Sequence, residues 1–463
     1  MRRRLRPARP ALPARTSREA RRARFRTGLG AARAVSAHDP RALPGAPFVA
    51  YRGGELFVED CAVAELAARH GTPLYAYSRA AMHAALAPYQ RALAGRDHLI
   101  CYAMKANSSL AVLQTFAALG CGFDIVSGGE LARVLAAGGE PAKVVFSGLG
   151  KTRAEMRQAL VAGVKCFNVE SEAELDLLSE VALGLGRRAP VSLRVNPDVD
   201  AGTHPYISTG LKGNKFGIAH DRALAAYRHA AALPGLEVVG IDCHIGSQIT
   251  EIGPYLDALD RLLDLVEAVE DSGIPLHHLD VGGGLGIRYT DETPPAADAL
   301  IAALLERLDA RGHGKRPLVF EPGRSLVGNA GVLLTEVLYL KPGAEKNFCV
   351  VDAAMNDLMR PALYEATMGI VAARLRDAPP VVYDVVGPVC ESGDWLGRDR
   401  ALAVRPGDTL AVLSAGAYGM TMASNYNTRP RSAEVMVEGA TATVIRARET
   451  TVELFRGETL MPR

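Results

Sequence analysis

The stretch "GFDIVSGGELARVLAAGGEPAKVVFSG", residues 122–148, holds one complete unit of the predicted fold. Its two ends, "GFDIVS" and "KVVFSG", are short runs of mainly apolar and β-branched residues, which indicate strands buried on both faces. Between them, Ser127 and Glu130 have the spacing of a capping box, which marks a helix start. The stretch therefore predicts a strand, a helix and a second strand in succession.

The same alternation continues from about residue 98 to residue 324. The capping-box spacing recurs at Thr152–Glu155 and Ser171–Glu174, and the apolar residues of 252–269 follow helical spacing. Eight strand–helix units favour a (β/α)8 TIM-like barrel. A doubly wound open sheet fits less well, because the glycine-rich stretch follows the seventh strand rather than the first. The predicted strands are "LICYAMK" (99–105), "GFDIVS" (122–127), "KVVFSG" (143–148), "CFNVES" (166–171), "VSLRVNP" (191–197), "VVGIDCHIGS" (238–247), "HLDVGGG" (278–284) and "LVFEPGR" (318–324).

After about residue 325, strand-like runs with turn residues such as "RPGD" (405–408) predict a second, mainly β domain of Greek-key or β-sandwich type. "FVAYRGGELFVED" (48–60) reads as a hairpin around Gly53 and Gly54, which we expect to join that domain. The predicted division is a basic disordered tail (1–46), N-terminal strands (47–70), the barrel (71–325) and the β domain (326–463). The strand-like runs are "VLLTEVLYL" (332–340), "NFCVVD" (347–352), "VVYDVV" (381–386), "TLAVLS" (409–414), "AEVMVE" (433–438), "TATVIRA" (441–447) and "TTVELF" (450–455).

Positive charge is concentrated at the N-terminus. The first 40 residues hold twelve Arg, no Lys, one Glu and one Asp, a composition typical of a disordered segment. A nucleic-acid-binding arm, a transit segment and an extension from a mis-assigned start remain open for this tail. The rest of the chain is acidic and has no apolar run near the ~18 residues of a membrane span. We therefore expect no nucleic-acid or membrane partner for the body of the chain.

The seven cysteines lie far apart and none forms a CxxC pair. This spacing argues against a disulfide framework and against a structural zinc site. We expect reduced thiols, no bound metal and a cytoplasmic location.

The ends of the predicted barrel strands carry residues with chemical potential, because functional groups of such barrels gather there. These are Lys105, His244, the "GGGLG" run (282–286) and "EPGRS" (321–325). Each has a plain structural interpretation: a salt bridge, a core histidine, a turn and an internal ion pair. Together, a lysine that desolvation would deprotonate, a glycine cradle for a phosphate, an acid and a flat ring suggest pyridoxal phosphate.

Six motifs carry a resemblance to a known family: "YAMKAN", "HIGSQ", "DVGGGLG", "FEPGRS", "VDAAMNDLMRPALY" and "GPVCESGD". They resemble the fold-type III pyridoxal-phosphate decarboxylases, and among these the diaminopimelate decarboxylase family. The resemblance covers roughly residues 47–455, with the motifs in the family's order. It implies a carboxy-lyase that releases CO2 from meso-2,6-diaminopimelate to give L-lysine.

The resemblance also implies roles for individual residues. Lys105 would attach covalently to the cofactor, Glu321 would pair with its pyridine nitrogen and His244 would stack on its ring. Cys390 would return a proton to the product carbon from the other subunit of a homodimer with shared active sites. The implied cofactor-binding residues further include Asp124, Ser247, Gly283, Gly284, Pro322, Gly323, Arg324 and Tyr418, and the implied substrate-binding residues are Arg324, Arg360, Tyr364, Glu391 and Tyr418. The loop 202–218 is expected to close over ligands.

Three other functions remain open. An ornithine or arginine decarboxylase of the same fold would need an acid, rather than Arg360, for a basic distal end. A catalytically inactive homologue would be expected to have lost Lys105 or Cys390. A racemase on the same barrel would use a tyrosine as its second base and lack "CESGD".

Overall fold

A computed structural model describes residues 43–200 and 214–463. These residues belong to one compact unit, Pro40–Arg463. Residues 1–42 of the predicted disordered tail (1–46) and residues 202–213 of the predicted closing loop lie outside the described residues. The last four residues of the predicted tail, 43–46, form a turn instead, and Leu43 packs against a core cluster. In the described part of the chain no helix is long and apolar enough to span a membrane.

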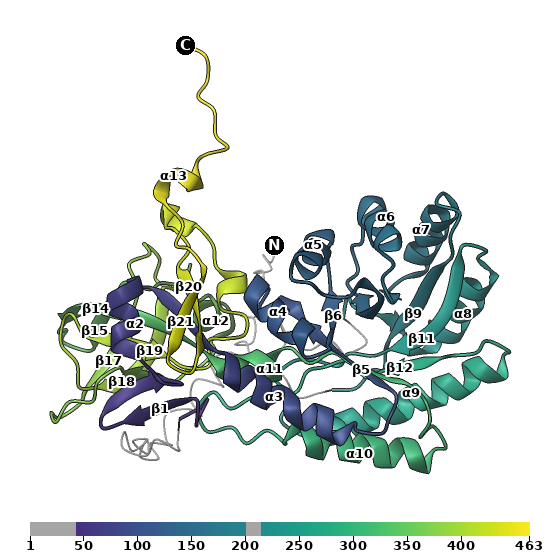
Figure 1. Ribbon diagram of the computed structural model, residues 1–463, viewed down its shortest axis with the longest axis horizontal. Coiled ribbons are helices and arrows are strands. Elements are labelled where there is room, and N and C mark those ends of the chain that lie inside the picture. Colours follow the sequence, from purple (N-terminus) through teal and green to yellow (C-terminus); the bar gives the residue numbers. More distant parts are fainter. Residues whose placement is uncertain (1–42, 201–213) are drawn as a thin grey trace, which may run out of the picture. The chain divides into compact units, whose positions relative to one another are not determined.

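Among the described residues, eight parallel strands close into a barrel, as the sequence predicts. Each strand pairs with its neighbour along the chain, and the ring closes between β13 and β5. Figure 1 shows the labelled barrel strands β5, β6, β9, β11 and β12 lying together. A two-residue strand, β10 (Ile218–Ala219), extends the sheet beside β9. The barrel strands are β5 (His98–Ala103), β6 (Gly122–Ile125), β7 (Val144–Phe146), β8 (Cys166–Val169), β9 (Ala189–Asn196), β11 (Leu236–Asp242), β12 (His278–Asp280) and β13 (Leu318–Phe320).

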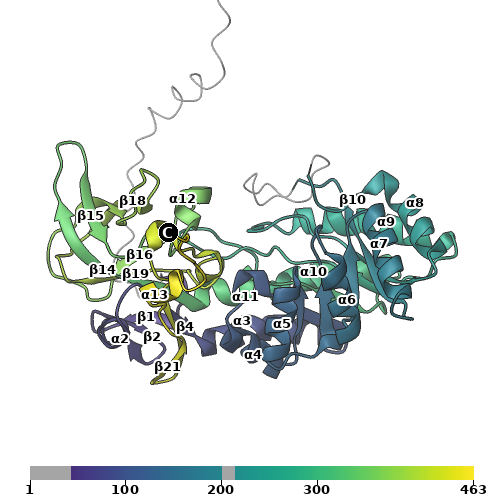
Figure 2. The same cartoon turned by 90° about the horizontal axis from the view of Figure 1, so that it is seen from above.

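Helices cover the outside of the barrel strands (Figure 2). Apart from α3, which precedes β5, they follow the barrel strands in the order that amphipathic patterning predicts, and the predicted helix at 252–269 is α9. The barrel helices are α3 (Arg79–Ala92), α4 (Leu110–Ala118), α5 (Gly128–Ala136), α6 (Arg153–Ala162), α7 (Glu172–Leu183), α8 (His220–Ala232), α9 (Gly253–Asp271), α10 (Ala297–Ala310) and α11 (Arg324–Val327).

Only one of the three expected capping boxes in the barrel is complete. At α6, the Thr152 hydroxyl and the Glu155 carboxylate satisfy each other's backbone N–H groups. At α5 and α7 the Ser caps form, but the carboxylates of Glu130 and Glu174 accept from the residue before the cap instead. The expectation of reciprocal boxes at these two helices was therefore wrong.

The second sheet is mixed rather than purely antiparallel. Its strands run in the order β18-β17-β15-β14-β4-β20-β21, with β19 joining β14 to β16. β4 lies within the range predicted for the barrel, 71–325, yet it pairs with β14 and β20 of the second sheet. The predicted domain boundaries remain a proposal. The strands are β4 (Leu74–Ser78), β14 (Gly331–Lys341), β15 (Asn347–Val351), β16 (Ile370–Ala372), β17 (Val381–Val386), β18 (Trp395–Leu402), β19 (Thr409–Val412), β20 (Ala433–Glu438) and β21 (Thr441–Arg446).

The N-terminal hairpin forms at Gly53 and Gly54, as predicted. Both glycines have positive φ, and strands β1 (Val49–Arg52) and β2 (Glu55–Val58) pair around them. With β3 (Cys61–Ala62) they make a separate three-stranded sheet, whose apolar side joins one core cluster with residues of β4, β14 and β19. Helix α2 (Val63–His70) follows directly and contributes to the same cluster.

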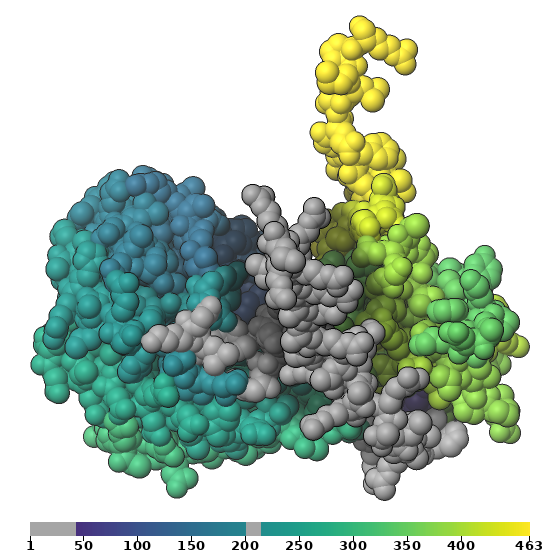
Figure 3. All heavy atoms as spheres, turned by 180° about the vertical axis from the view of Figure 1, so that it is seen from behind, coloured from purple at the N-terminus to yellow at the C-terminus, as the bar shows by residue number. Residues whose placement is uncertain are grey.

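One of the predicted strands is a helix. The run "TTVELF" forms α13 (Thr451–Leu454), which begins with a complete capping box between Thr450 and Glu453. This spacing is the same helix-start signal that the barrel helices carry, so the strand expectation there was wrong. The residues after α13 are exposed, and Figure 3 shows them as a yellow projection.

Candidate active site

Lys105 stands directly after β5, in the short helix η2 (Met104–Ala106), and faces the second barrel strand. Its Nζ donates to Oδ2 of Asp124 at 2.5 Å, and Asp124 is fully buried in β6. Burial acts to lower the pKa of Lys105, but the charges of Asp124 and Glu321 outweigh it and raise the pKa above its usual value. The expectation that desolvation deprotonates this amine was therefore wrong for the chain alone, because the surrounding carboxylates hold the proton.

Three buried carboxyl groups cluster at the ends of β11, β12 and β13. Oxygen atoms of Asp242, Asp280 and Glu321 lie within 4.8 Å of one another. Asp280 accepts from the Gly282 N–H at 2.9 Å, and Glu321 accepts from the Asn168 amide at 3.3 Å. Burial is the main cause that raises all three pKa values, that of Asp280 to about 7. A metal ion would also fit this oxygen spacing, so the expected absence of a metal stays a prediction.

The glycine run after β12 brings bare backbone close to neighbouring segments. A Cβ atom on Gly283 would lie 2.0 Å from the Glu321 carbonyl oxygen, so no side chain fits there. Gly284 has φ +101°, and a Cβ on it would lie 2.3 Å from the Gly246 carbonyl oxygen. The Gly283 N–H donates to Nδ1 of His244 at 3.2 Å. Burial, with the charges of Arg194 and Lys105, lowers the pKa of His244 far below its usual value, so its ring is neutral.

Arg324 is the first residue of α11 and is 4% exposed. Its guanidinium donates to the hydroxyl of Ser247 at 2.9 Å and to that of Tyr289 at 2.5 Å. The Tyr418 ring lies 4.7 Å from the guanidinium carbon, and the Tyr418 N–H donates to the carbonyl of Ala106 at 2.7 Å. Arg324 thus connects the turn after β13, the eighth barrel strand, through Tyr418 to Ala106, which follows Lys105.

The turn before Arg324 is tied to the first barrel strand. The Pro322 carbonyl accepts from the Ala103 N–H at 3.0 Å. A Cβ on Gly323 would lie 3.1 Å from both the Cβ and the carbonyl oxygen of Ala103. The backbone of "EPGR" therefore approaches the segment that carries Lys105.

A second arginine lies near the first. Arg360 begins α12 (Arg360–Tyr364), is 7% exposed, and its guanidinium carbon lies 4.8 Å from the Tyr289 ring and 6.0 Å from the Tyr364 ring. Its Nε is buried without a hydrogen-bond partner among the described residues. Burial lowers the pKa of Arg360, and the Arg324 charge acts in the same direction. The site therefore contains two buried cations, both close to the ring of Tyr289.

Cys390 and Glu391 lie in the exposed loop between β17 and β18. Their contacts in the described chain are with Tyr426 and Asn427, not with the group around Lys105. All seven cysteines are free, and Cys390 alone among them is exposed. Of the predicted site residues, these two are the ones that a single chain does not bring to the others.

Comparison with known proteins gives the family. Residues 78–328 match the model described as "Pyridoxal-dependent decarboxylase, pyridoxal binding domain". A diaminopimelate decarboxylase of Pseudomonas aeruginosa is 62% identical over 413 residues, which cover 89% of this chain and 99% of that protein. The chain belongs to the diaminopimelate decarboxylase family. A crystal structure of the family from M. jannaschii, in complex with L-lysine, has a TM-score of 0.87 at 39% identity and covers 91% of this chain and 99% of that one. The Helicobacter pylori structure, also with L-lysine, has a TM-score of 0.81 at 42% identity and covers 85% and 98%.

Sequence reasoning missed part of this site. Asp242 and Asp280 end strands β11 and β12, but both lie inside the predicted strands 238–247 and 278–284, so the predicted strand ends did not point to them. Tyr289 lies in a loop with no regular pattern, and the local sequence gives no signal that it lies near both arginines. In this member of the diaminopimelate decarboxylase family, the missed groups are those that surround the predicted ones.

The carboxyl cluster predicts a pH-dependent stability. Replacing Asp280 with Asn is expected to stabilise the cofactor-free protein, more at pH 8 than at pH 5. The raised pKa of Asp280, about 7, means that the folded chain binds more protons here than the unfolded chain. The stability that this carboxyl contributes is therefore lost as pH rises from its unfolded pKa, ~3.9, through its folded pKa. The stabilisation gained by Asp280→Asn should accordingly grow by about 2–3 kcal/mol between pH 5 and pH 8. Thermal unfolding at both pH values measures it, and equal gains would contradict it.

Asp384→Asn is the control of opposite sign. Burial acts to raise the pKa of Asp384, but hydrogen bonds from the Asp399 N–H and Lys346 outweigh it and lower the pKa. This carboxylate contributes stability above its unfolded pKa, so the variant is expected to be less stable than the parent protein at pH 8.

Proposed function

We propose that the chain catalyses the pyridoxal-phosphate-dependent decarboxylation of meso-2,6-diaminopimelate to L-lysine and CO2. Besides membership of the family, one observation carries this proposal. Two buried arginines, Arg324 and Arg360, have guanidinium carbons 5.8 Å and 4.8 Å from the Tyr289 ring and no carboxylate partner among the described residues. Buried charges are usually paired, so a site of this kind suits a ligand that brings its own carboxylate.

The residues present fit pyridoxal phosphate. Bare backbone at Gly283 and Gly284, with the Ser247 hydroxyl and Arg324, suits a phosphate group. Lys105 is an amine at the mouth of the barrel for covalent attachment to the cofactor aldehyde, and Asp124 lies beside it. Glu321, buried among other carboxyls, suits a protonated pyridine nitrogen, which would supply the missing positive charge.

When bound, the cofactor supplies an electron sink for the bond between the α-carbon and its carboxylate. The protein's own residues would orient and protonate. Neutral His244 would present a flat, uncharged ring face, since its pKa lies far below its usual value. Asp124 would take the proton that Lys105 must release to attach, because the two atoms already share a 2.5 Å hydrogen bond. Glu321 would hold a proton at the pyridine nitrogen.

Recognition of the substrate needs groups for both of its amino-acid ends. We propose that Arg360 and Tyr364 bind carboxylates of the substrate, together with Arg324 and Tyr418. Glu391 would bind the distal ammonium. Arginine forms forked hydrogen bonds with carboxylates, and a carboxylate is the natural partner of an ammonium. A basic distal end, as in ornithine or arginine, would instead meet the buried Arg360 charge.

Cys390 and Glu391 would serve the site of a second copy of the chain. We propose a homodimer in which each active site combines Lys105 of one subunit with Cys390 of the other. Cys390 would donate the proton that the product carbon needs after CO2 leaves. The exposure of this one thiol, among seven, supports a role at a subunit boundary. The free thiols also suit the proposed cytoplasmic location.

A substrate panel tests the proposal. CO2 release is measured with meso-diaminopimelate, ornithine, arginine and lysine, each across a concentration series. We expect kcat/KM for meso-diaminopimelate to exceed the others by at least about 1000-fold, because a site built for a polar group strongly rejects analogues that lack it. A preference for ornithine or arginine would contradict the proposal, and so would the absence of CO2 release from every compound.

A further inference from the structure

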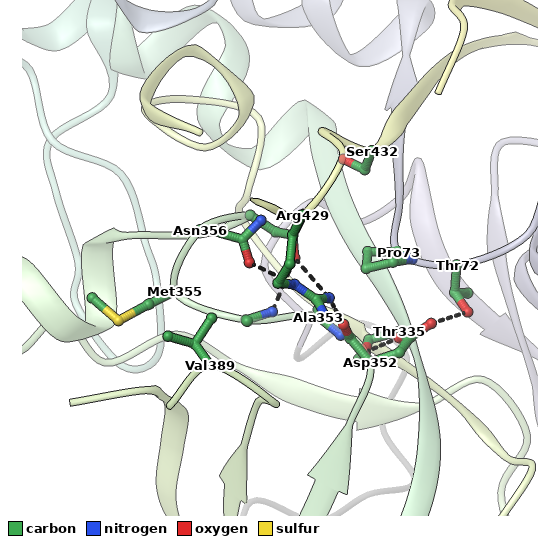
Figure 4. Close-up of polar contacts among 12 residues, drawn as sticks. Thr72, Pro73, Thr335, Asp352, Ala353, Met355, Asn356, Val389, Arg429 and Ser432 are labelled. Atoms are coloured by element: carbon green, nitrogen blue, oxygen red, sulfur yellow. Dashed lines mark hydrogen bonds and ion pairs between the residues drawn. The ribbon is translucent and has the colours of Figure 1, made fainter. Parts of the chain in front are cut away.

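The loop with Cys390 and Glu391 is fixed from its inner side by Asp394. This residue is 4% exposed, and its two oxygens accept from the backbone N–H groups of Val389 and Met355, each at 2.7 Å. Asp394 thus closes the loop on itself and ties it to the segment after β15. Figure 4 shows Val389 and Met355 on neighbouring segments. A loop with three successive exposed residues, 390–392, is therefore anchored at its base.

A second anchor contacts the reactive residues themselves. The Cys390 N–H donates to Oδ1 of Asn427 at 3.0 Å. The next side chain, Glu391, is hydrogen-bonded to Tyr426, which raises the pKa of Tyr426. Asn427 thus holds the backbone of Cys390, the proton donor of the proposed mechanism.

This second anchor has a strained backbone. Asn427 and Thr428 both have positive φ, 56° and 54°. Left-handed backbone in residues other than glycine costs about 1–3 kcal/mol each and persists only where the surroundings enforce it. Such strain is concentrated at functional sites, so its position beside Cys390 is informative.

Arg429 supplies the contacts that enforce this conformation. Its Nε donates to Oδ1 of Asn356 at 3.0 Å, and its Nη2 donates to the Asp352 carbonyl at 2.5 Å (Figure 4). The Asp352 carboxylate is itself held by hydroxyl groups, those of Thr335 at 2.7 Å and Thr72 at 2.6 Å. The segment 424–429 is therefore fastened to the sheet at one end and reaches the Cys390 loop at the other.

We propose that Asn427 is a positioning residue for the Cys390 thiol. This inference rests on the proposed function, in which Cys390 is a proton donor. A proton donor must be held within a fraction of an ångström of its target, and a hydrogen bond to its own backbone N–H sets where its side chain begins. Asn427 would act through Cys390 and would not touch the substrate.

Asn427→Gly tests the proposal in the holoenzyme. Glycine adopts the left-handed backbone without strain, so the variant removes the hydrogen bond to Cys390 while the fold is retained. We expect kcat to fall about 10- to 100-fold, with KM and the cofactor absorption unchanged. The solvent deuterium isotope effect on kcat should rise, because protonation becomes slower than the other steps. Asn427→Asp keeps the acceptor oxygen and should restore most of the turnover.

The matched control is Thr428→Gly. It makes the same change at the same backbone conformation, at a residue whose side chain shows no hydrogen bond among the described residues. Its kcat and isotope effect should stay within about twofold of the parent values. If Thr428→Gly lowers kcat as much as Asn427→Gly does, loop flexibility rather than the Asn427 bond is responsible and the proposal is wrong.

A double variant separates this inference from the proposed function. Adding Asn427→Gly to Cys390→Ala should cause little further loss, because residues that act as a unit are not additive. A further loss of about tenfold or more would overturn the positioning role. If Cys390→Ala alone left kcat unchanged while Asn427→Gly lowered it, the proton-donor role of Cys390 would fail. If Cys390→Ala lowered kcat and Asn427→Gly did not, only the positioning role would fail.

Discussion

Lys105→Ala should abolish the absorption band of covalently attached cofactor and lower turnover by about four orders of magnitude or more. No other amine at the barrel mouth is in reach of Asp124 among the described residues: the one ion pair that Asp124 makes there is with Lys105. Absorption spectra of the purified protein and CO2 release measure the two effects. An unchanged spectrum would contradict the attachment.

Lys151→Ala is a matched control for that variant. Lys151 is also a buried lysine paired with a carboxylate, Glu174, at 2.6 Å. Its removal leaves an unpaired buried charge and should lower thermal stability by about 3–5 kcal/mol. The absorption band should nevertheless persist in the folded fraction, so a spectral loss specific to Lys105→Ala cannot be attributed to a missing ion pair.

Cys390→Ala should lower kcat by about 100- to 10,000-fold, the usual contribution of a positioned acid. Cofactor absorption should be retained, because Cys390 lies in a loop that a single chain does not bring to Lys105. Turnover and absorption of the same preparation measure the contrast. Cys349→Ala, at a thiol that is fully buried in β15, is the control and should retain kcat in the folded enzyme.

Mixing the two inactive variants tests the shared site directly. In a hybrid dimer of Lys105→Ala and Cys390→Ala subunits, one site has both residues intact and the other has neither. With free exchange of equal amounts, half of the dimers are hybrid, so activity should recover to about a quarter of the parent value per site. Subunit exchange is verified first, for example by mass. If activity then does not recover, a site built from two subunits is contradicted.

The barrel could be predicted because its strands are buried on both faces and are apolar throughout. The hairpin at Gly53 and Gly54 was equally clear, since paired glycines fit its left-handed turn. β18, "WLGRDRAL", was not predicted, because an edge strand with an irregular burial pattern and two arginines has little local signal. Its pairing with β17 is a tertiary contact that composition does not encode.

The candidate site, like the fold, could be predicted from the sequence only in part. Lys105, Gly283 and Glu321 follow predicted strands, so their convergence follows from the barrel itself. Asn427 depends on a chain reversal 37 residues after Cys390, and no local pattern indicates that contact. The protonation of Lys105 was predicted wrongly because its sign depends on Asp124 and Glu321, whose distance from the amine only the fold sets.

The position of β4 constrains how the chain can fold during synthesis. This strand, Leu74–Ser78, lies between β14 and β20, so its partners are more than 250 residues away along the chain. The last barrel strand ends at Phe320, but β20 begins only at Ala433. At ordinary translation speeds the ribosome needs on the order of ten seconds for that interval. During it the barrel has all its strands, while one side of β4 remains an open edge that a chaperone or a second nascent chain would find exposed.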